Sequence, residues 1–496
     1  MHERSAIMEK IELAKHIKQG DTFYTPFTSP KGLGDILSLS SWARCWLPEF
    51  LWIGLIIRKQ GRKKGFENMS YIIEELKAEN MVVPQLSKIF ELSSEQQRKY
   101  WSIVAQYVGK NMLLPLTLVI TPDINEIFYD FFFDFSMDID ENISELLDLT
   151  KETTSFHDDL STDISFIVDW FYIKKGRVYI SNKIDVLPTA ISEYYKCNHE
   201  DEVMKMYRPI IRATFQSLCS LDCSKEFSEK MWKVLGEISE CNPLAIVWDE
   251  EKEKMDFYKI TKQTIEYFSA NNEDKKMESK YTVIMGMTCY IFRIYQEIVE
   301  KQMQNDISGR VLFRTMLESY INLKYMIQLE KEVPDIYDRF KAYGNGKYKL
   351  VMAKLREGKY TVSENSQIDE RIMELLVNED MDEAFVNISV GYFDKISIRN
   401  KFKNCGEEEL YEIYYEYATN FAHGIWGAVR ESSMLICDNP AHIYHCVPDY
   451  YTEQNLRSVC SDCEMVIKKT FDAIASYIEL PEFYNIYLIK GSDVNG

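Results

Sequence analysis

The stretch SGRVLFRTMLESYINLKYM, residues 308–326, decides the fold of the C-terminal half of the chain. Its apolar residues recur at helical spacing and leave almost no polar face, and such a helix is usually buried. Arg310, Arg314 and Glu318 stand four residues apart, so they share one side of the helix. An isolated buried charge costs several kcal/mol. These side chains are therefore expected either to pair, as a structural Arg314–Glu318 ion pair, or to serve a site.

Helical spacing continues on both sides of this stretch. Only 20 glycines and 13 prolines interrupt the 496 residues. Apolar periodicity predicts long helices over residues 250–270, 275–304, 307–329, 407–436 and 452–477. Short strands are predicted only at residues 177–180 and 484–489. The apolar runs 47–57 and 112–120 are too short to span a bilayer and are expected to be core segments. The sequence therefore predicts an all-α fold.

A chain of 496 residues is too long for one hydrophobic core, so more than one domain is expected. The helical pattern breaks at Cys241-Asn242-Pro243, just before the acidic stretch WDEEKEKMD. We place the boundary there, which gives an N-terminal helical domain over residues 1–245 and a C-terminal helical domain over residues 246–496. The N-terminal domain contains no motif that carries chemistry. Its default role is to recognise a partner or to restrain the C-terminal domain.

Charge and cysteine content narrow the class of protein. The formal net charge of −20 argues against a surface that coats nucleic acid or anionic membrane as a whole, although it leaves room for a local basic groove. The chain has 11 cysteines, an odd number, and its N-terminus lacks the apolar segment of a signal peptide. These features predict unpaired thiols in a reducing cytoplasm.

A second informative stretch is LYEIYYEYATNFAHGIWGAVRE, residues 410–431. Tyr411, Tyr415, Thr419 and His423 recur at intervals of four and form a polar stripe along one side of the predicted helix, with Asn420 beside it. Hydroxyl groups in such a stripe can hydrogen-bond an imidazole, fix its tautomer and set its pKa near neutrality. A single helical histidine is more often a satisfied core residue, but the hydroxyl stripe favours a site.

Together these motifs resemble a known family. The helix with Arg314 and Glu318, followed by Tyr-rich helices and a Y-x3-Y-x3-T-x3-H-G motif that ends in His423 and Gly424, is similar to the bacterial family catalogued as domain of unknown function 5677. The likeness covers residues 278–477. That family is similar in layout to the HEPN superfamily, small helical bundles that often dimerise and include many metal-independent endoribonucleases of toxin–antitoxin and antiphage systems. The resemblance implies that the C-terminal domain is a HEPN-like bundle.

The resemblance also implies a mechanism. In HEPN nucleases the histidine of an R-x4-6-H motif relays a proton, while the arginine stabilises the phosphorane formed when a ribose 2′-hydroxyl attacks. This sequence has no arginine at that spacing before His423. The site would therefore need Arg314 or Arg310 from the other helix, or a charge supplied by a partner chain.

Basic residues gather locally in this acidic chain. The stretch RFKAYGNGKYKLVMAKLREGK, residues 339–359, interleaves cations with tyrosines, and KISIRNKFKN, residues 395–404, adds a second basic run. Such interleaving suits a phosphate backbone with stackable bases. A solvated face, or contact with acidic regions of the same assembly, is the alternative. The predicted nucleic-acid-binding residues are Arg339, Lys341, Lys347, Lys349, Lys354, Arg356, Arg399 and Lys401.

Residue types that bind zinc also cluster near the C-terminus: Cys437, His442, His445 and Cys446, with Cys460 and Cys463 downstream. The two downstream cysteines are expected inside a helix at core spacing, and the overall spacing matches no zinc module. No phosphate-binding loop or nucleophile motif is found. We therefore assign neither metal ligands nor a cofactor from the sequence.

The leading hypothesis is an antiphage-defence or toxin-like effector whose C-terminal domain is a metal-independent endoribonuclease. It would use His423 as general acid and base and Arg314 as the electrostatic partner. Its supporting residues would be Glu318, Tyr415, Thr419 and Asn420. Such a protein is expected to bind RNA and to form a homodimer or larger assembly, without membrane association. The competing hypothesis is a non-catalytic helical scaffold or sensor that binds a partner protein or a nucleotide through the same polar groove.

Overall fold

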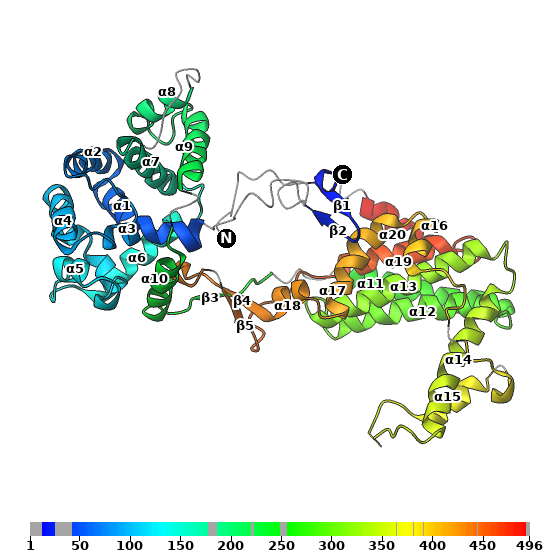
Figure 1. Ribbon diagram of the computed structural model, residues 1–496. Helices are drawn as coiled ribbons and strands as arrows, with labels where there is room; N and C mark the ends of the chain where they lie inside the picture. The colour runs from blue at the N-terminus through cyan, green and yellow to red at the C-terminus, as the bar shows by residue number, and fades with distance from the viewer. Residues whose placement is uncertain are drawn as a thin grey trace. The chain divides into compact units, whose positions relative to one another are not determined.

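The computed structural model describes residues 12–24, 42–176, 186–219, 223–248, 255–363, 365–379, 381–389, 391–443 and 445–492. Within these ranges the chain is built almost entirely of helices, which confirms the predicted all-α fold (Figure 1). It divides into two compact units, each with its own core. Unit 1 comprises Met1–Leu244 and Ile436–Val447, and unit 2 comprises Ala245–Leu435 and Pro448–Gly496. Residues 436–447 thus fold with unit 1, although the sequence analysis placed them in the C-terminal domain.

Unit 1 is organised around α1 (Leu47–Gln60), a helix whose residues 47–57 are all buried. It packs against α2 (Arg62–Ala78) and α7 (Asp159–Lys174). Trp52 of α1 is fully buried, and aromatic rings meet it edge-on from α4 and from α7. A fully buried large apolar side chain contributes about 1.5–3 kcal/mol, so α1 supplies much of the stability of this unit. The prediction that this apolar run is a core segment is confirmed.

The remaining helices of unit 1 surround α1 and α7. They are α3 (Leu86–Phe90), α4 (Ser94–Val108), α5 (Pro122–Phe132), α6 (Ile139–Thr153), α8 (Val186–Glu193), α9 (Met204–Cys219) and α10 (Lys225–Glu237). A small hairpin of β1 (Ile17–Gln19) and β2 (Thr22–Tyr24) precedes them. No helix in the described part of either unit combines the length and the apolar content needed to cross a membrane.

Unit 2 is a bundle built around α13 (Ile307–Leu329), which has the bounds predicted from the sequence. It packs against α12 (Ser279–Glu300), α16 (Ile398–Asn404), α17 (Glu416–Ala422) and α19 (Cys460–Ile474). The first turn of α13 lies close to the preceding loop, because a Cβ atom on Gly309 would stand 2.3 Å from the carbonyl oxygen of Met303. Only glycine permits this approach.

The other helices of unit 2 extend or flank the bundle. They are α11 (Met255–Asn271), α14 (Ile336–Arg356), α15 (Glu370–Val377), α18 (Trp426–Ser433) and α20 (Glu482–Ser492). Figure 1 shows α14 and α15 beside each other, and the two helices share a small separate core of Met352, Met373, Val377 and Val386. The predicted strand at residues 484–489 is wrong, because these residues belong to α20. The predicted strand at residues 177–180 lies outside the described residues.

The single helix predicted over residues 407–436 is also wrong, because it is broken at Gly424. A π-type turn over Leu410–Tyr415 leads directly into α17, whose C-cap is His423. Gly424 has φ +59°, its N–H donates to the carbonyl of Phe421, and the N–H of Ile425 donates to that of Asn420. These bonds form a Schellman motif, in which a left-handed glycine ends a helix. The chain restarts as α18 and then continues into a strand.

A short antiparallel ladder brings together the points where the chain leaves and re-enters unit 1. β3 (Pro243–Leu244) pairs with β4 (Met434–Cys437) in the register Pro243↔Cys437 and Leu244↔Ile436, and β5 (Cys446–Pro448) follows beside β4. The residues in register are separated by almost two hundred positions in the sequence. The ladder therefore links two segments of unit 1 that enclose most of unit 2 along the chain.

Candidate functional site

Arg314 of α13 is held by hydroxyl groups from the Tyr-rich helix. Its Nη2 donates to the Tyr415 hydroxyl at 2.6 Å and its Nε donates to Thr419 Oγ1 at 3.1 Å. The Tyr415 hydroxyl in turn donates to Glu318 Oε1 at 2.5 Å, and Arg314 Nη2 lies 3.1 Å from the same carboxylate oxygen. The guanidinium also lies over the Tyr415 ring, 4.7 Å from its centroid. We call Arg314, Glu318, Tyr415 and Thr419 the Arg–Tyr cluster.

Burial shapes the electrostatics of the Arg–Tyr cluster. Tyr415 is 5% exposed. Burial raises the pKa of its hydroxyl, and the hydrogen bond to Glu318 and the charge of that carboxylate raise it further. The tyrosine therefore stays protonated and acts as a donor to the carboxylate. The side chains of Arg314 and Glu318 are 21% and 34% exposed, so solvent reaches the charged pair at its edge.

His423 lies one helical turn beyond the Arg–Tyr cluster. It caps α17, its backbone N–H donates to the Thr419 carbonyl at 3.1 Å, and its side chain is exposed. His423 follows Thr419, the residue that Arg314 bonds, by four positions, which is one helical turn along the chain. The hydroxyls of Tyr415 and Thr419 bond Arg314 and Glu318. Among the described residues, the His423 ring accepts or donates no hydrogen bond.

Two other members of the predicted stripe have local roles. Tyr411 stacks on the ring of Tyr415 with centroids 5.2 Å apart and an interplanar angle of 19°. The side-chain amide of Asn420 donates to the carbonyl of Glu416 at 2.8 Å and to that of Tyr417 at 3.3 Å. Asn420 therefore stabilises the last turn of α17, which carries His423.

Arg310, the other arginine considered for the site, is placed differently. It is 4% exposed and donates to the backbone carbonyls of Gln304, at 2.8 Å, and of Arg457. Burial lowers the pKa of its guanidinium. Arg310 thus binds the loop before α13 and the segment before α19, and Arg314 is the arginine that reaches the stripe.

An open groove of 360 Å³ lies beside Glu318 within unit 2. Its lining includes Tyr290, Asn322 and Tyr392 from three different segments of the bundle. Tyr290 is 52% exposed and Tyr392 is 38% exposed, and the Tyr392 hydroxyl accepts from the Asn322 amide at 3.0 Å. The groove therefore offers two aromatic rings and a carboxylate to a ligand.

Most of the predicted nucleic-acid-binding residues have protein partners. Arg356 donates to Glu370 and Glu383, and Lys349 donates to two backbone carbonyls of the segment after α15. Lys347 likewise donates to the Ser389 carbonyl at 3.1 Å. Exposed side chains remain at Arg339, which pairs with Asp335 at 2.9 Å, at Lys354, and at Arg399, which lies 4.0 Å from Glu412. Lys341 is half-buried.

Lys401 has the least accessible charge of this group. Its side chain is 0% exposed, and its ammonium lies 2.6 Å from the 2% exposed carboxylate of Asp394 and donates to Asn322 Oδ1 at 2.8 Å. Burial lowers the pKa of Lys401, and the Asp394 contact opposes that shift. As placed, this ammonium neutralises a buried carboxylate inside unit 2.

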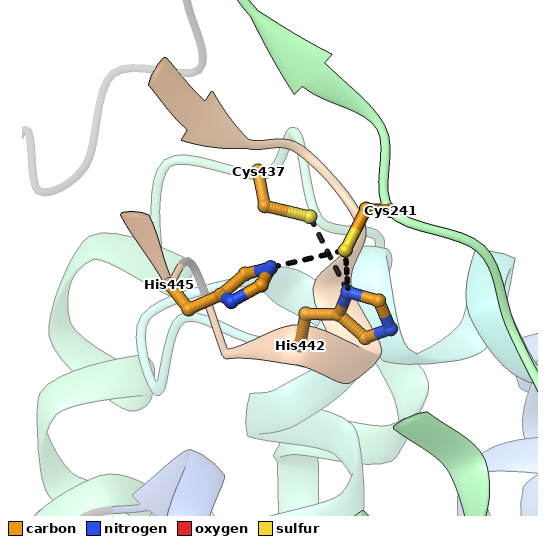
Figure 2. Close-up of side chains that lie close together, drawn as sticks. All are labelled: Cys241, Cys437, His442 and His445. Atoms are coloured by element: carbon orange, nitrogen blue, oxygen red, sulfur yellow. Dashed lines mark hydrogen bonds between the residues drawn. The ribbon is translucent and has the colours of Figure 1, made fainter. Parts of the chain in front are cut away.

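A second polar cluster lies in unit 1, where the sequence analysis assigned no site. Cys437, His442 and His445 gather there with Cys241, and Figure 2 shows the four side chains turned toward one another. Cys460 and Cys463 are instead buried in α19 in the core of unit 2, as their spacing predicted. The missed residue is Cys241. The only signal at that position was Cys241-Asn242-Pro243, which marked a domain boundary.

Comparison with known proteins identifies one family. The model of a family of unknown function, DUF5677, matches residues 281–442. This stretch contains the whole Arg–Tyr cluster and His423, and it supports the resemblance to that family over part of the range stated from the sequence. No curated protein and no solved structure matches the chain.

Proposed function

We propose that unit 2 is a HEPN-like domain that cleaves RNA without a metal, in a cytoplasmic antiphage-defence or toxin-like effector that works as a homodimer or larger assembly. The observation that carries the proposal is the position of Arg314. It comes from a different helix than His423 and bonds Thr419, one turn before that histidine. In the proposed site, α13 would thereby supply the guanidinium that the R-x4-6-H motif takes from the histidine's own helix.

In this proposal His423 moves the proton and Arg314 stabilises charge. The exposed imidazole can accept the proton of a ribose 2′-hydroxyl and return it to the leaving oxygen. The guanidinium edge that solvent reaches can face the charge that develops on the phosphorus oxygens. Tyr415 and Thr419 are positioning residues, because their hydroxyls fix the guanidinium plane. Glu318 orients Arg314 through the shared Tyr415 hydroxyl.

RNA would lie along the groove beside Glu318. Bases stack on exposed aromatic rings regardless of sequence, and Tyr290 and Tyr392 offer such rings. Phosphate contacts would come from cations with exposed side chains, Arg339, Lys354 and Arg399. The overall charge of −20 would restrict such contacts to local groups of cations.

The test is cleavage of labelled single-stranded RNA by the purified full-length chain, with and without added magnesium. His423→Ala should lower the rate by about 100-fold or more, the usual loss when a general acid–base group is removed. Its melting temperature should not change, because the ring is exposed. Arg314→Ala should lower the rate as well, and His16→Ala, which removes a histidine from unit 1, should not. Equal cleavage by wild type and His423→Ala would reject the proposal.

A second candidate function is a non-catalytic scaffold or sensor. The observation that favours it is that the Arg314 guanidinium bonds Thr419, Tyr415 and Glu318 of unit 2, so the Arg–Tyr cluster can act as a neutral contact that joins α13 to α17. In that case Arg314→Ala and Glu318→Ala would lower the melting temperature, because each strands the charge of the other. Neither wild type nor any variant would cleave RNA.

A further inference from the structure

Four metal-binding side chains meet at the edge of unit 1. The ligand atoms of Cys241, Cys437, His442 and His445 all lie within 4.8 Å of one another. Cys241 Sγ is 3.2 Å from His442 Nδ1 and 3.3 Å from His445 Nε2, and Cys437 Sγ is 3.4 Å from His442 Nδ1 (Figure 2). Around a tetrahedral zinc ion with two sulfur and two nitrogen ligands, the ligand atoms stand about 3.3–3.8 Å apart. The three sulfur–nitrogen separations lie at or slightly below the short end of that range, so the four ligand atoms are close enough to share one ion.

The orientation of His442 is a second, independent observation. Its Nδ1 faces both sulfur atoms, while its Nε2 lies 3.1 Å from the backbone carbonyl oxygen of Gly236. A carbonyl can only accept, so Nε2 carries the proton and Nδ1 presents a lone pair to the cluster. Histidines that bind metals usually donate their other N–H in this way to a carbonyl or a carboxylate. His442 therefore has the tautomer and the support of a ligand.

Backbone bonds hold the segments that carry the ligands. The N–H of Asp438 donates to the carbonyl of Asn242 at 2.8 Å, and the Asn439 amide donates to the carbonyl of Glu240 at 2.7 Å. The N–H of Cys437 donates to the carbonyl of His445 at 3.1 Å, which closes the loop between them. These bonds bring both sides of the cluster together through contacts of the backbone and of Asn439, so the four ligand side chains are held near one another.

We propose that Cys241, Cys437, His442 and His445 bind a zinc ion with a structural role. Two thiolates and two imidazoles are the ligand set of closed tetrahedral zinc sites, and the charge of two thiolates balances that of Zn²⁺. All four positions are filled by protein, which leaves no open position for a substrate. His442 and His445 also line an open groove of 710 Å³ in unit 1, which provides a path of entry for the ion.

The position of the four ligands in the chain explains why a zinc ion here would have a structural role. The chain passes between the units after Leu244, after Leu435 and after Val447. Cys241 precedes the first passage by three residues, Cys437 follows the second by two, and His445 precedes the third by two. One ion would therefore bind all three connecting segments at their unit 1 ends, where β3 pairs with β4 through two residue pairs. This inference does not depend on RNA cleavage by unit 2.

The test measures metal in the full-length chain purified under reducing conditions without chelator. We expect about one zinc ion per chain, with X-ray absorption showing two sulfur ligands at about 2.3 Å and two nitrogen ligands at about 2.0–2.1 Å. In competition with a chelator, Cys241→Ser and His442→Ala should bind zinc more than about 100-fold less tightly, since even changes to supporting residues cost 10–100-fold. Cys446→Ser is the matched control, because this neighbouring cysteine lies outside the cluster, and it should bind zinc as wild type does.

Three results would overturn the proposal. They are a folded wild-type chain without zinc, a Cys241–Cys437 disulfide in place of the metal, and a loss of zinc in Cys446→Ser as large as that in Cys241→Ser. Absorption spectroscopy of the wild-type chain decides the ligand set even where a variant does not fold. Removal of zinc should also speed proteolysis at residues 241–248 and 436–447, because the ion is what joins these segments most firmly. Unchanged proteolysis would contradict the structural role.

Discussion

A substitution at Glu407 tests most directly how the fold of unit 2 positions the Arg–Tyr cluster. The residue is 6% exposed, and its carboxylate receives three donors. Oε1 accepts from the Tyr320 hydroxyl at 2.5 Å and from Lys324 Nζ at 2.6 Å, both on α13, and Oε2 accepts from Lys469 Nζ of α19 at 2.8 Å. Glu407 thus connects the helix that carries Arg314 with the start of the segment that carries Tyr415.

The magnitude of a Glu407→Gln change follows from these contacts. Removing one partner of a fully buried ion pair costs about 3–5 kcal/mol. Here Lys324 and Lys469 are 24% and 35% exposed, so water solvates part of their charge. We therefore expect a loss of about 2–3 kcal/mol in the free energy of unfolding. The new amide also places an N–H donor against one of the ammonium groups, which adds to the loss.

Scanning calorimetry of the full-length chain measures this loss. At about 2–4 °C per kcal/mol for a domain of 150–250 residues, one of the two unfolding transitions should move down by about 5–10 °C. The adjacent Glu408→Gln is the control, because Glu408 is exposed and its loss should change stability by less than about 0.5 kcal/mol. Equal shifts for the two variants would refute the reasoning.

The pH dependence provides a second check on Glu407. Burial raises its pKa, but the hydrogen bonds from Lys324, Lys469 and Tyr320 outweigh burial, and the pKa is lowered overall. An acid with a lowered folded pKa stabilises the fold fully above its unfolded pKa of about 4.3 and loses that contribution as the pH falls through the folded value. The gap between wild type and Glu407→Gln should therefore stay constant near neutrality and narrow below about pH 4.

Two further substitutions test buried charges in the two units. Asp169 of α7 is 1% exposed, its carboxylate oxygens have no partner among the described residues, and burial raises its pKa well above the usual value, so the folded state retains its proton. Asp169→Asn should equal or exceed wild type in melting temperature, with a gap that widens as the pH rises above about 4; a constant gap would contradict this. Lys401→Met should lower stability by about 3 kcal/mol or more by leaving Asp394 buried and uncompensated, whereas the exposed Lys403→Met should change it by less than about 0.5 kcal/mol. Equal unfolding midpoints for the two lysine variants would show that Lys401 is accessible.

Sequence patterns predicted elements best where one physical signal dominated. The bounds of α13 followed from an unbroken apolar period of 23 residues, and residues 47–57 are buried because nothing polar but Glu49 interrupts them. Short runs carry a weaker periodic signal. Residues 484–489 contain aromatic and β-branched side chains, which are common in strands, yet Tyr484 lies in a helix and packs on Phe471, with ring centroids 5.1 Å apart. A run of six residues does not distinguish the two structures by period alone.

The Arg–Tyr cluster was predictable in part. Spacing of four placed Arg314 with Glu318 on one face and Tyr415 with Thr419 on another. Residue spacing does not show that the two faces meet, or that the Tyr415 hydroxyl joins the arginine to the carboxylate. The basic run shows the same limit, since Arg356 is neutralised by Glu370 and Glu383, acids that follow it by 14 and 27 residues. Partners at such separations depend on how α14 and α15 pack.

The zinc cluster shows why a local motif can fail although the ligands are present. Cys437, His442 and His445 lie within nine residues, but the cysteines that follow them do not complete the set, because Cys446 lies outside the cluster and Cys460 and Cys463 belong to a helix core. The fourth ligand lies 196 residues upstream of Cys437, because most of unit 2 is inserted between the two cysteines. An insertion leaves the geometry of the parent unit intact while it separates its ligands in sequence. When a domain is inserted between the ligands of such a zinc site, the sequence changes in a recognisable way. It shows a lone cysteine at a domain boundary, followed much later by a cysteine and two histidines.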